Sequence, residues 1–354
     1  MIIPVLLLFG PTASGKTSLL EKLYANFSNF FPNKAPGKSR NGINGIEIIS
    51  ADSMQVYRGM DIGTAKPSME ERRKIPHHLI DILDPNEQFN AGAFVRLAEE
   101  AIRSIFSRGA LPVVSGGTGF YLKNLIMGMS EAPPADEKIR NDLKKELSDK
   151  GASSLMEELA RADPISAERI HINDEYRLLR ALEVLRIGGK PLSSYSSPWT
   201  GKETASLSSK PMHFRDNFCF LLLGLRRSRK DLYERINERC AAMFKTGLID
   251  EVENLYKKGY TPFHPGLRAI GYREFFVEDP CSTGELGSWR LSQDYKGIEA
   301  LVAQNSRRYA KRQITFFSSI PNVRWLDLRE DTDFEDPGLV KELGSLLDLF
   351  SLSC

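Results

Sequence analysis

The sequence has few cysteines, and their spacing limits the class of protein. Its 354 residues include four cysteines, at positions 219, 240, 281 and 354, and no two of them form a CxxC pair. This spacing argues against a disulfide framework and against a cysteine-rich zinc site. A reducing compartment is therefore expected, and the sequence predicts a cytoplasmic protein.

Long hydrophobic runs and a strong charge of one sign are also missing. The apolar stretch at 5–9 is too short for a signal peptide or a bilayer span, so we expect a buried first strand and no membrane association. With 48 basic and 46 acidic residues, the formal net charge is only +2, so any RNA contact has to come from a local basic patch. A hydrophobic content of 41% excludes a chain that is disordered as a whole.

Strand-like and helix-like segments alternate along most of the chain. The predicted strands lie at 5–9, 46–50, 111–115 and 218–225. The helices expected between or after them lie at 19–27, 94–106 and 229–246. Exposed loops are expected at 28–45 and 193–209, which are rich in small and polar residues.

A different pattern occupies the middle of the chain. Three helices are predicted there without strands between them, at 136–150, 153–162 and 174–187, with Asp136 and Asp174 as N-caps and Gly151 and Gly188 as stops. The length suits two domains or one domain with an insertion. We therefore predict an α/β fold, with a parallel-sheet core formed by 1–128 and 205–354 and a helical insertion at 129–204.

A phosphate-binding loop follows the first predicted strand. Residues 10–17 read GPTASGKT, which fits G-x-x-x-x-G-K-[ST] between an apolar strand and an amphipathic helix. The backbone N–H groups of such a loop and the N-terminus of its helix form a cradle for anions. The plainer alternative is a tight glycine turn without a ligand.

Individual loop residues have distinct expected roles. Lys16 adds a positive charge, and the hydroxyl of Thr17 is placed to bind a Mg²⁺ ion held by the phosphates. The predicted diphosphate-binding residues are Gly10, Pro11, Thr12, Ala13, Ser14, Gly15, Lys16 and Thr17.

The loop indicates a polyphosphate ligand but no particular reaction. A nucleotide hydrolase or kinase usually carries an acidic residue at the end of a later apolar strand, where it holds Mg²⁺. The strand at 111–115 ends instead in Ser-Gly-Gly, and Asp52 lies in the unusual segment SADSMQVYRGMDIGTAKP at 50–67. This mismatch favours a phosphate group that leaves over one that is transferred.

Five segments together resemble the tRNA dimethylallyltransferase family, also called tRNA isopentenyltransferases, in its bacterial type. They are GPTASGKT, SADSMQVYRGMDIGTAKP, SGGTGFYL at 115–122, RAIGYRE at 268–274 and KRQITFF at 311–317. The resemblance implies transfer of a dimethylallyl group from dimethylallyl diphosphate to N6 of the adenine just 3′ of the anticodon, in tRNAs that read codons starting with U. Diphosphate leaves, Mg²⁺ is the expected cofactor, and ATP is not the expected donor.

Asp52, Thr118 and Arg239 are the predicted catalytic residues. An exocyclic adenine amine is a poor nucleophile, so a carboxylate that removes its proton assists the reaction. The family's catalytic Asp falls on Asp52, although an Asp here equally suits a turn cap. Thr118 matches a Thr near the reacting amine, with a strand-to-helix turn as the alternative. Arg239 matches a phosphate-contacting Arg, Arg235 is a close rival, and a solvated helix face is the plainer alternative for both.

The predicted tRNA contacts combine a basic stripe with segments matched through the resemblance. Four basic residues at 307, 308, 311 and 312 share one side of a helix, although such a run is often only a solvated face. The complete predicted set is Asp52, Ser53, Met54, Gln55, Thr118, Arg140, Tyr176, Arg177, Arg180, Arg268, Arg273, Arg307, Arg308, Lys311 and Arg312. Because N6 of a stacked base is out of reach, the base has to be extruded into a cavity shared by the phosphate loop and Asp52.

Two other functions stay open at this stage. A nucleotide or nucleoside kinase would share the phosphate loop and transfer phosphate from ATP to a small acceptor. A non-catalytic RNA-binding protein gated by a nucleotide would form no covalent product. Structural roles are expected for His77, His78 and His171, which lack the spacing of a metal site. A monomer that binds the tRNA anticodon stem-loop is the expected working state.

Overall fold

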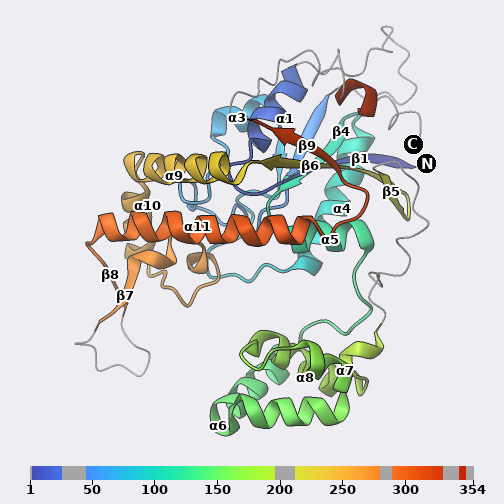
Figure 1. Cartoon of the computed structure of the whole chain (residues 1–354), viewed down its shortest axis with the longest axis vertical. Coiled ribbons are helices and arrows are strands. Elements are labelled where there is room, and N and C mark those ends of the chain that lie inside the picture. Colours follow the sequence, from blue (N-terminus) through green and yellow to red (C-terminus); the bar gives the residue numbers. More distant parts are fainter. Residues whose placement is uncertain (1, 26–44, 196–211, 280–288, 330–342, 348–354) are drawn as a thin grey trace. The chain divides into compact units, whose positions relative to one another are not determined.

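The computed structural model of the chain describes residues 2–25, 45–195, 212–279, 289–329 and 343–347. The chain divides into two compact units (Figure 1), of which the first comprises 1–126 with 206–354 and the second 127–205. The sequence placed the first boundary between 128 and 129. The second predicted boundary, between 204 and 205, and nearly all of the loops expected at 28–45 and 193–209 lie outside the described residues.

Unit 1 is built on a seven-stranded sheet. Its strands are β1 (Ile3–Phe9), β2 (Ile46–Ser50), β3 (His77–His78), β4 (Leu111–Gly116), β5 (Met212–Arg215), β6 (Phe218–Arg227) and β9 (Arg324–Leu328). The order is β3-β2-β4-β1-β6, and both β5 and β9 pair with β6. β5 runs antiparallel to its neighbour, whereas the other pairings are parallel. The predicted parallel α/β core is confirmed.

The central position of β1 explains its composition. It pairs with β4 on one side and with β6 on the other, and residues 5–9 are at most 1% exposed. A parallel strand that is covered on both faces has to be apolar throughout, which accounts for the run VLLLF. The register Phe9↔Gly116 and Ser50↔Ser115 brings the carboxyl ends of β1, β2 and β4 to one edge, the usual place for a ligand site in such sheets.

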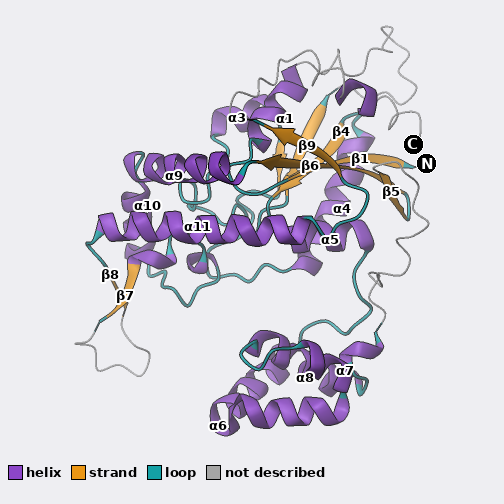
Figure 2. Ribbon diagram, in the orientation of Figure 1, coloured by secondary structure: helices purple, strands orange, loops and turns teal. Residues whose placement is uncertain are grey.

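Helices flank this sheet (Figure 2). They are α1 (Lys16–Ala25), α3 (Met69–Lys74), α4 (Ala91–Ser107), α5 (Gly119–Met127), α9 (Arg229–Lys245), α10 (Leu248–Lys257) and α11 (Tyr295–Phe317). α11 packs along α9, and the short strands β7 (Phe276–Glu278) and β8 (Trp289–Leu291) form a separate antiparallel pair. None of the described helices is long and apolar enough to span a membrane.

Unit 2 is helical, as predicted for this stretch. It contains α6 (Glu137–Ala162), α7 (Pro164–Arg169), α8 (Glu175–Gly188) and the short 3₁₀ helix η1 (Leu192–Ser194). Gly151 breaks α6 with a φ of 76°, so the two predicted helices on either side of it are confirmed. Asp136 and Asp174 cap α6 and α8 through their side chains, also as predicted. Leucines from α6 and α8 form a core of their own.

The cysteines behave differently from one another. Cys240 on α9 is a free, buried thiol, whereas Cys219 on β6 is disulfide-bonded. The spacing of the cysteines argued against a disulfide framework, so this bond differs from that expectation.

Candidate active site

The phosphate loop joins β1 to α1 in a conformation that its small residues permit. Gly15 has a φ of 102°, in the left-handed region that favours glycine. A Cβ on Gly10 would lie 2.9 Å from the backbone oxygen of Leu225, so a side chain there would push β6 away. The motif residues therefore shape the loop itself, in which the N–H of Thr12 is engaged by Gln313 and that of Ser14 by the carbonyl oxygen of Pro11.

Two arginines hold the loop from outside. Arg227 of β6 donates through Nε to the carbonyl oxygen of Ser14 at 2.9 Å. Arg235 of α9 donates through Nε to the carbonyl oxygen of Ala13 at 3.0 Å. Arg235, the rival of Arg239 in the sequence, thus binds the backbone of the loop.

The side chain of Lys16 folds back onto the phosphate loop. Its Nζ donates to the carbonyl oxygens of Gly10 and Pro11, both at 2.9 Å. Burial and the neighbouring charge of Arg239 lower the pKa of Lys16 to about 8, against an opposing effect of Asp52. An anion placed here would restore the full positive charge of Lys16.

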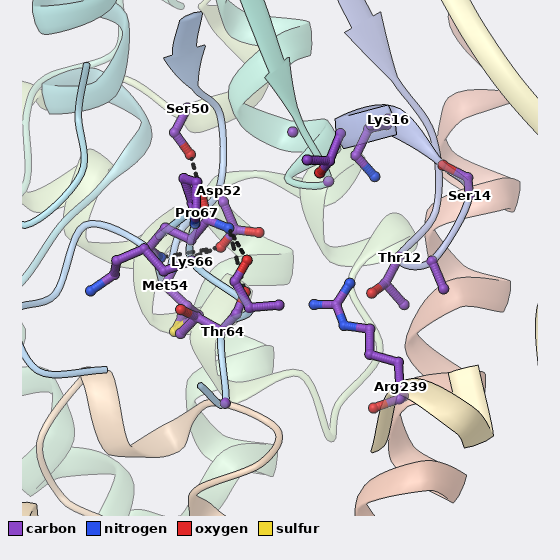
Figure 3. Close-up of a pocket in the computed structure, with 18 of the residues that line it drawn as sticks. Thr12, Ser14, Lys16, Ser50, Asp52, Met54, Thr64, Lys66, Pro67 and Arg239 are labelled. Atoms are coloured by element: carbon purple, nitrogen blue, oxygen red, sulfur yellow. Dashed lines mark hydrogen bonds between the residues drawn. The ribbon is translucent and has the colours of Figure 1, made fainter. Parts of the chain in front are cut away.

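A cavity of about 970 Å³ brings the phosphate loop and the segment after β2 together. Figure 3 shows the carboxylate of Asp52, the ammonium of Lys16 and the guanidinium of Arg239 directed into one space. The predicted site residues in its wall are Thr12, Ala13, Ser14, Gly15, Lys16, Thr17, Asp52, Ser53, Met54, Gln55, Arg239, Arg268, Arg273 and Arg312. The shared opening that the chemistry required is therefore present.

Asp52 caps a turn and also faces the cavity. Its Oδ1 accepts hydrogen bonds from the backbone N–H groups of Met54 at 2.8 Å and Gln55 at 3.3 Å. Oδ2 receives no hydrogen bond from the described residues. The two readings of this residue are therefore compatible, since one oxygen orients the carboxylate and the other is left for a ligand.

Thr118 lies in the turn between β4 and α5. Its hydroxyl accepts a hydrogen bond from the N–H of Ser53 at 3.0 Å, and its own N–H donates to the carbonyl of Ala51 at 3.1 Å. Thr118 thus positions the backbone next to Asp52. The glycines before Thr118 allow the close approach of another backbone segment and not of a ligand, because a Cβ on Gly116 would lie 2.2 Å from the backbone oxygen of Ala51.

Arg239 projects from α9 into the cavity. Burial lowers the pKa of its guanidinium, and the nearby Asp52 opposes this effect. An arginine stays charged even so, because its pKa in water is above 12. Arg239 therefore adds a permanent positive charge opposite Asp52 and beside Lys16.

The predicted basic stripe on α11 divides into two kinds of residue. Arg308 and Lys311 are exposed, and Arg312 is exposed at the cavity, where it stacks on the ring of Tyr309 at 5.7 Å. Arg307 instead hydrogen-bonds to the side chain of Asn237 on α9. The stripe is therefore real, with Arg307 partly engaged inside the unit.

The predicted tRNA contacts in unit 2 also divide. Tyr176 is 72% exposed, and the side chain of Arg177 is 71% exposed. Arg140 and Arg180 both bind the carboxylate of Glu183 at 2.8 Å. Glu183 is fully buried, so these two arginines have a structural task whether or not they also contact RNA.

Comparisons with known proteins show which family the chain resembles. The family model described as IPP transferase matches residues 55–320. A tRNA dimethylallyltransferase of Geobacter sulfurreducens is 40% identical over 326 residues, which make up 92% of either chain. The chain belongs to the IPP transferase family. The resemblance of the five segments is thereby confirmed.

Solved structures of IPP transferases extend the match to the fold. The full-length tRNA isopentenylpyrophosphate transferase of Bacillus halodurans is 34% identical with a TM-score of 0.61, and the match covers 99% of this chain and 98% of that one. A eukaryotic dimethylallyltransferase, described as acting on tRNA, is 25% identical with a TM-score of 0.67, over 92% of this chain and 74% of that one.

Several residues of this IPP transferase site were not predicted. Glu251 of α10 accepts hydrogen bonds from the backbone N–H groups of residues 61, 62 and 63, at 2.8, 2.8 and 3.1 Å. The side chain of Lys66 is fully buried and bound to Asp61 and Asp81, both at 2.6 Å. These contacts hold the segment 52–67 in place. They could not be predicted from the sequence, because a polar residue on a helix, such as Glu251, usually faces solvent.

Tyr309 and Gln313 of α11 also face the site. Burial and the charge of Asp52 raise the pKa of Tyr309 to about 12, against an opposing hydrogen bond with Thr118. Gln313 is 5% exposed and bonds to both the phosphate loop and the turn after β4. The motif KRQITFF includes Gln313, but its spacing alone does not show which way the side chain points.

The protein itself offers few ligands for a metal ion. Among the described residues, no group of three or more His, Cys, Asp or Glu side chains could hold one. Thr17 lines the cavity next to Lys16. This arrangement fits a Mg²⁺ ion that arrives with a diphosphate, because Mg²⁺ keeps several waters and readily takes phosphate oxygens with few protein ligands.

Proposed function

We propose that the protein transfers a dimethylallyl group from dimethylallyl diphosphate to N6 of the adenine just 3′ of the anticodon, in tRNAs that read codons starting with U. The observation that carries this proposal is the single cavity lined by both the phosphate loop and Asp52. Membership of the IPP transferase family supports the same reaction.

The phosphate loop would hold the leaving group. The bond between the oxygen of diphosphate and C1 of the prenyl group breaks, and diphosphate departs with the electron pair. Lys16, Arg239 and the loop amides face this developing negative charge, and preorganised positive groups stabilise it in the transition state. When bound at Thr17, Mg²⁺ would neutralise further charge on the phosphate oxygens.

Asp52 would act on the nucleophile. As N6 forms its bond to C1, the amine loses a proton, which Oδ2 of Asp52 accepts. Oδ1 stays hydrogen-bonded to the backbone of Met54 and Gln55, so the carboxylate is oriented without using its second oxygen. A positioned general base of this kind is worth about 10²- to 10⁴-fold in rate.

Exposed cations around the cavity would bind the tRNA. Arg268, Arg273 and Arg312 line the cavity, and Arg308 and Lys311 extend the charge along α11. Phosphate contacts by such side chains provide affinity, while the extruded adenine enters the cavity. We propose that the protein works in the cytoplasm as a monomer, with the anticodon stem-loop as its macromolecular substrate.

A product assay tests the function. The purified protein is incubated with Mg²⁺, an anticodon stem-loop, and either labelled dimethylallyl diphosphate or γ-labelled ATP. We expect label from the prenyl donor on the adenosine of the stem-loop. Label from ATP on a small acceptor would point to a kinase instead, and RNA binding without any covalent product would point to a nucleotide-gated RNA-binding protein.

A further inference from the structure

Gln313 of α11 bridges two walls of the cavity that lie far apart in the sequence. Its Oε1 accepts a hydrogen bond from the backbone N–H of Thr12, in the phosphate loop, at 3.0 Å. Its Nε2 donates to the carbonyl oxygen of Gly117, in the turn that leads to Thr118, at 2.8 Å. The two backbone partners have fixed polarity, so the amide fits in only one orientation.

The surroundings of Gln313 are shaped to hold this amide. The residue is 5% exposed, and a Cβ on Gly117 would lie 2.4 Å from Nε2. Tyr309, one helical turn earlier on α11, lies beside both Gln313 and Thr118. The phosphate loop, the turn after β4 and α11 are thus joined through one buried side chain.

Both bridged groups lie beyond the ends of their strands. β1 ends at Phe9 and β4 at Gly116. The hydrogen bonds of the sheet therefore fix these strands relative to each other, but they do not include Thr12 and Gly117. Among the described residues, Gln313 is the side chain that hydrogen-bonds to both loops. Any rotation of one loop relative to the other has to break one of its two bonds.

We propose that Gln313 is a positioning residue that holds the phosphate loop in a fixed position relative to the cavity wall that includes Asp52 and Gly117. The inference rests on the proposed prenyl transfer, in which C1 has to lie between the leaving oxygen and N6. Each wall can still bind its own ligand without Gln313, but the two ligands are then misaligned. Such a displacement lowers the rate of the chemical step far more than it weakens binding.

The test compares Gln313→Met with a matched control. Methionine has a similar length and makes neither hydrogen bond, whereas Gln304→Met applies the same change to an exposed residue of α11. For Gln313→Met we expect a single-turnover rate lower by about 100-fold, with the Kd values for dimethylallyl diphosphate and for the stem-loop each within about 3-fold of wild type. A wild-type rate would overturn the proposal, as would a loss explained entirely by either Kd.

Gln313→Glu separates alignment from a general loss of structure. A carboxylate keeps the acceptor for Thr12 but sets a negative oxygen against the carbonyl of Gly117, and only its protonated form can donate there. We therefore expect the rate of this variant, divided by the wild-type rate at each pH, to rise as the pH falls. The same ratio for Gln313→Met should stay flat. A flat ratio for both variants would contradict the hydrogen-bond role.

A binding experiment distinguishes failure of this inference from failure of the proposed function. The affinity of the stem-loop is measured with and without saturating inorganic diphosphate, which needs no turnover. In the wild type we expect the two ligands to affect each other's affinity, and in Gln313→Met this coupling should vanish while Gln304→Met retains it. Coupling that persists in Gln313→Met would overturn the positioning role even if wild-type protein formed no prenylated product.

Discussion

Asp52 and Lys16 show how single side chains can meet a structural need and still leave a reactive group free. The carboxylate of Asp52 caps a turn with one oxygen, and Lys16 donates to two loop carbonyls while it faces the cavity. Both groups are therefore oriented before any ligand arrives. Preorganised groups of this kind lose little freedom during a reaction, which is why they contribute to its rate.

Asp52→Asn isolates the chemical role of this residue. The amide oxygen still accepts the hydrogen bonds from Met54 and Gln55, so the loop keeps its shape, but the side chain can no longer take up a proton. We expect turnover to fall by about 100-fold or more, with tRNA affinity nearly unchanged. Steady-state kinetics and a filter-binding assay measure the two quantities. Undiminished turnover would remove Asp52 as the base.

Lys16 makes binding of diphosphate depend on pH. Its pKa of about 8 in the free protein means that the ammonium loses its proton as the pH rises through 8. Because the anion binds the charged form, its Kd should rise above pH 8, by up to about tenfold per pH unit. Lys16→Arg is the control, since arginine stays charged in this range. Titration calorimetry with diphosphate should show a shallower pH dependence for that variant.

At the scale of elements, α11 contributes to the site in two ways. One face carries the exposed cations Arg308 and Lys311, and another carries the buried Gln313. The glycines of the turn after β4 allow this helix to approach closely, since a Cβ on Gly119 would lie 2.4 Å from the ring of Phe316. The turn and the helix therefore have to be considered together, although almost 200 residues separate them.

Gly116→Ala tests how tightly these elements fit. The new methyl group would lie 2.2 Å from the backbone oxygen of Ala51, and neither backbone can move without disturbing the sheet. We expect the free energy of unfolding to fall by about 1–3 kcal/mol or more. Gly45→Ala, where the new methyl group would have no atom within 4 Å, should change it by less than about 0.5 kcal/mol. Urea titrations of both variants provide the comparison.

The exposed cations of α11 are expected to bind phosphates. Replacing Arg308 and Lys311 by glutamine should weaken stem-loop binding for all sequences alike and reduce the slope of log Kd against log salt by roughly one per residue. Arg96→Gln on α4, where the guanidinium pairs with Glu100, should leave the slope unchanged. Equal slopes for all variants would show that this stripe is only a solvated face.

The elements that could be predicted are those with a strong local signal. Continuous apolar runs revealed β1, β2, β4 and β6, and the spacing of apolar residues revealed α4 and α9. The two-residue strand β3 and the antiparallel β5 were missed, because they are short and their pairing with β2 and β6 depends on distant residues. In the site, the loop motif and Asp52 could be predicted, but the burial of Gln313 depends on a glycine turn remote in sequence.

At the scale of the whole molecule, the chain builds two apolar cores, one around the sheet of unit 1 and one among the helices of unit 2. Beside the second core, unit 2 places a buried carboxylate, Glu183, between Arg140 and Arg180. The N–H of Asp136 also donates to Glu183, at 2.9 Å. This carboxylate therefore ties α8 to the start of α6.

Glu183→Gln should destabilise unit 2. The neutral amide cannot balance the charge of two guanidinium groups, so the free energy of unfolding should fall by about 2 kcal/mol. This loss is smaller than the loss expected for a wholly buried ion pair, because the side chains of both arginines are partly exposed. Glu157→Gln removes an exposed ion pair with Arg161 and should cost less than about 0.5 kcal/mol. Calorimetry of the full chain would show the difference.

Acid should abolish the contribution of Glu183. Burial raises the pKa of this carboxyl, but the hydrogen bonds from Arg180 and Arg140 outweigh burial, so the pKa lies below its usual 4.5. A lowered pKa in the folded state gives stability that is present above pH 4.5 and lost as the pH falls through the folded value. The difference in stability between wild type and Glu183→Gln should therefore shrink on acidification. A difference independent of pH would contradict this assignment.

The order of the strands has a consequence for how the chain is made. β1 is synthesised before unit 2 but pairs with β6, which begins at residue 218, after the whole of unit 2. A nascent chain that stops short of that point presents one side of β1 without its partner strand. Such an apolar edge invites pairing with other chains. Truncated products ending within unit 2 should accordingly aggregate, and synthesis that pauses there would need a chaperone to shield the exposed strand.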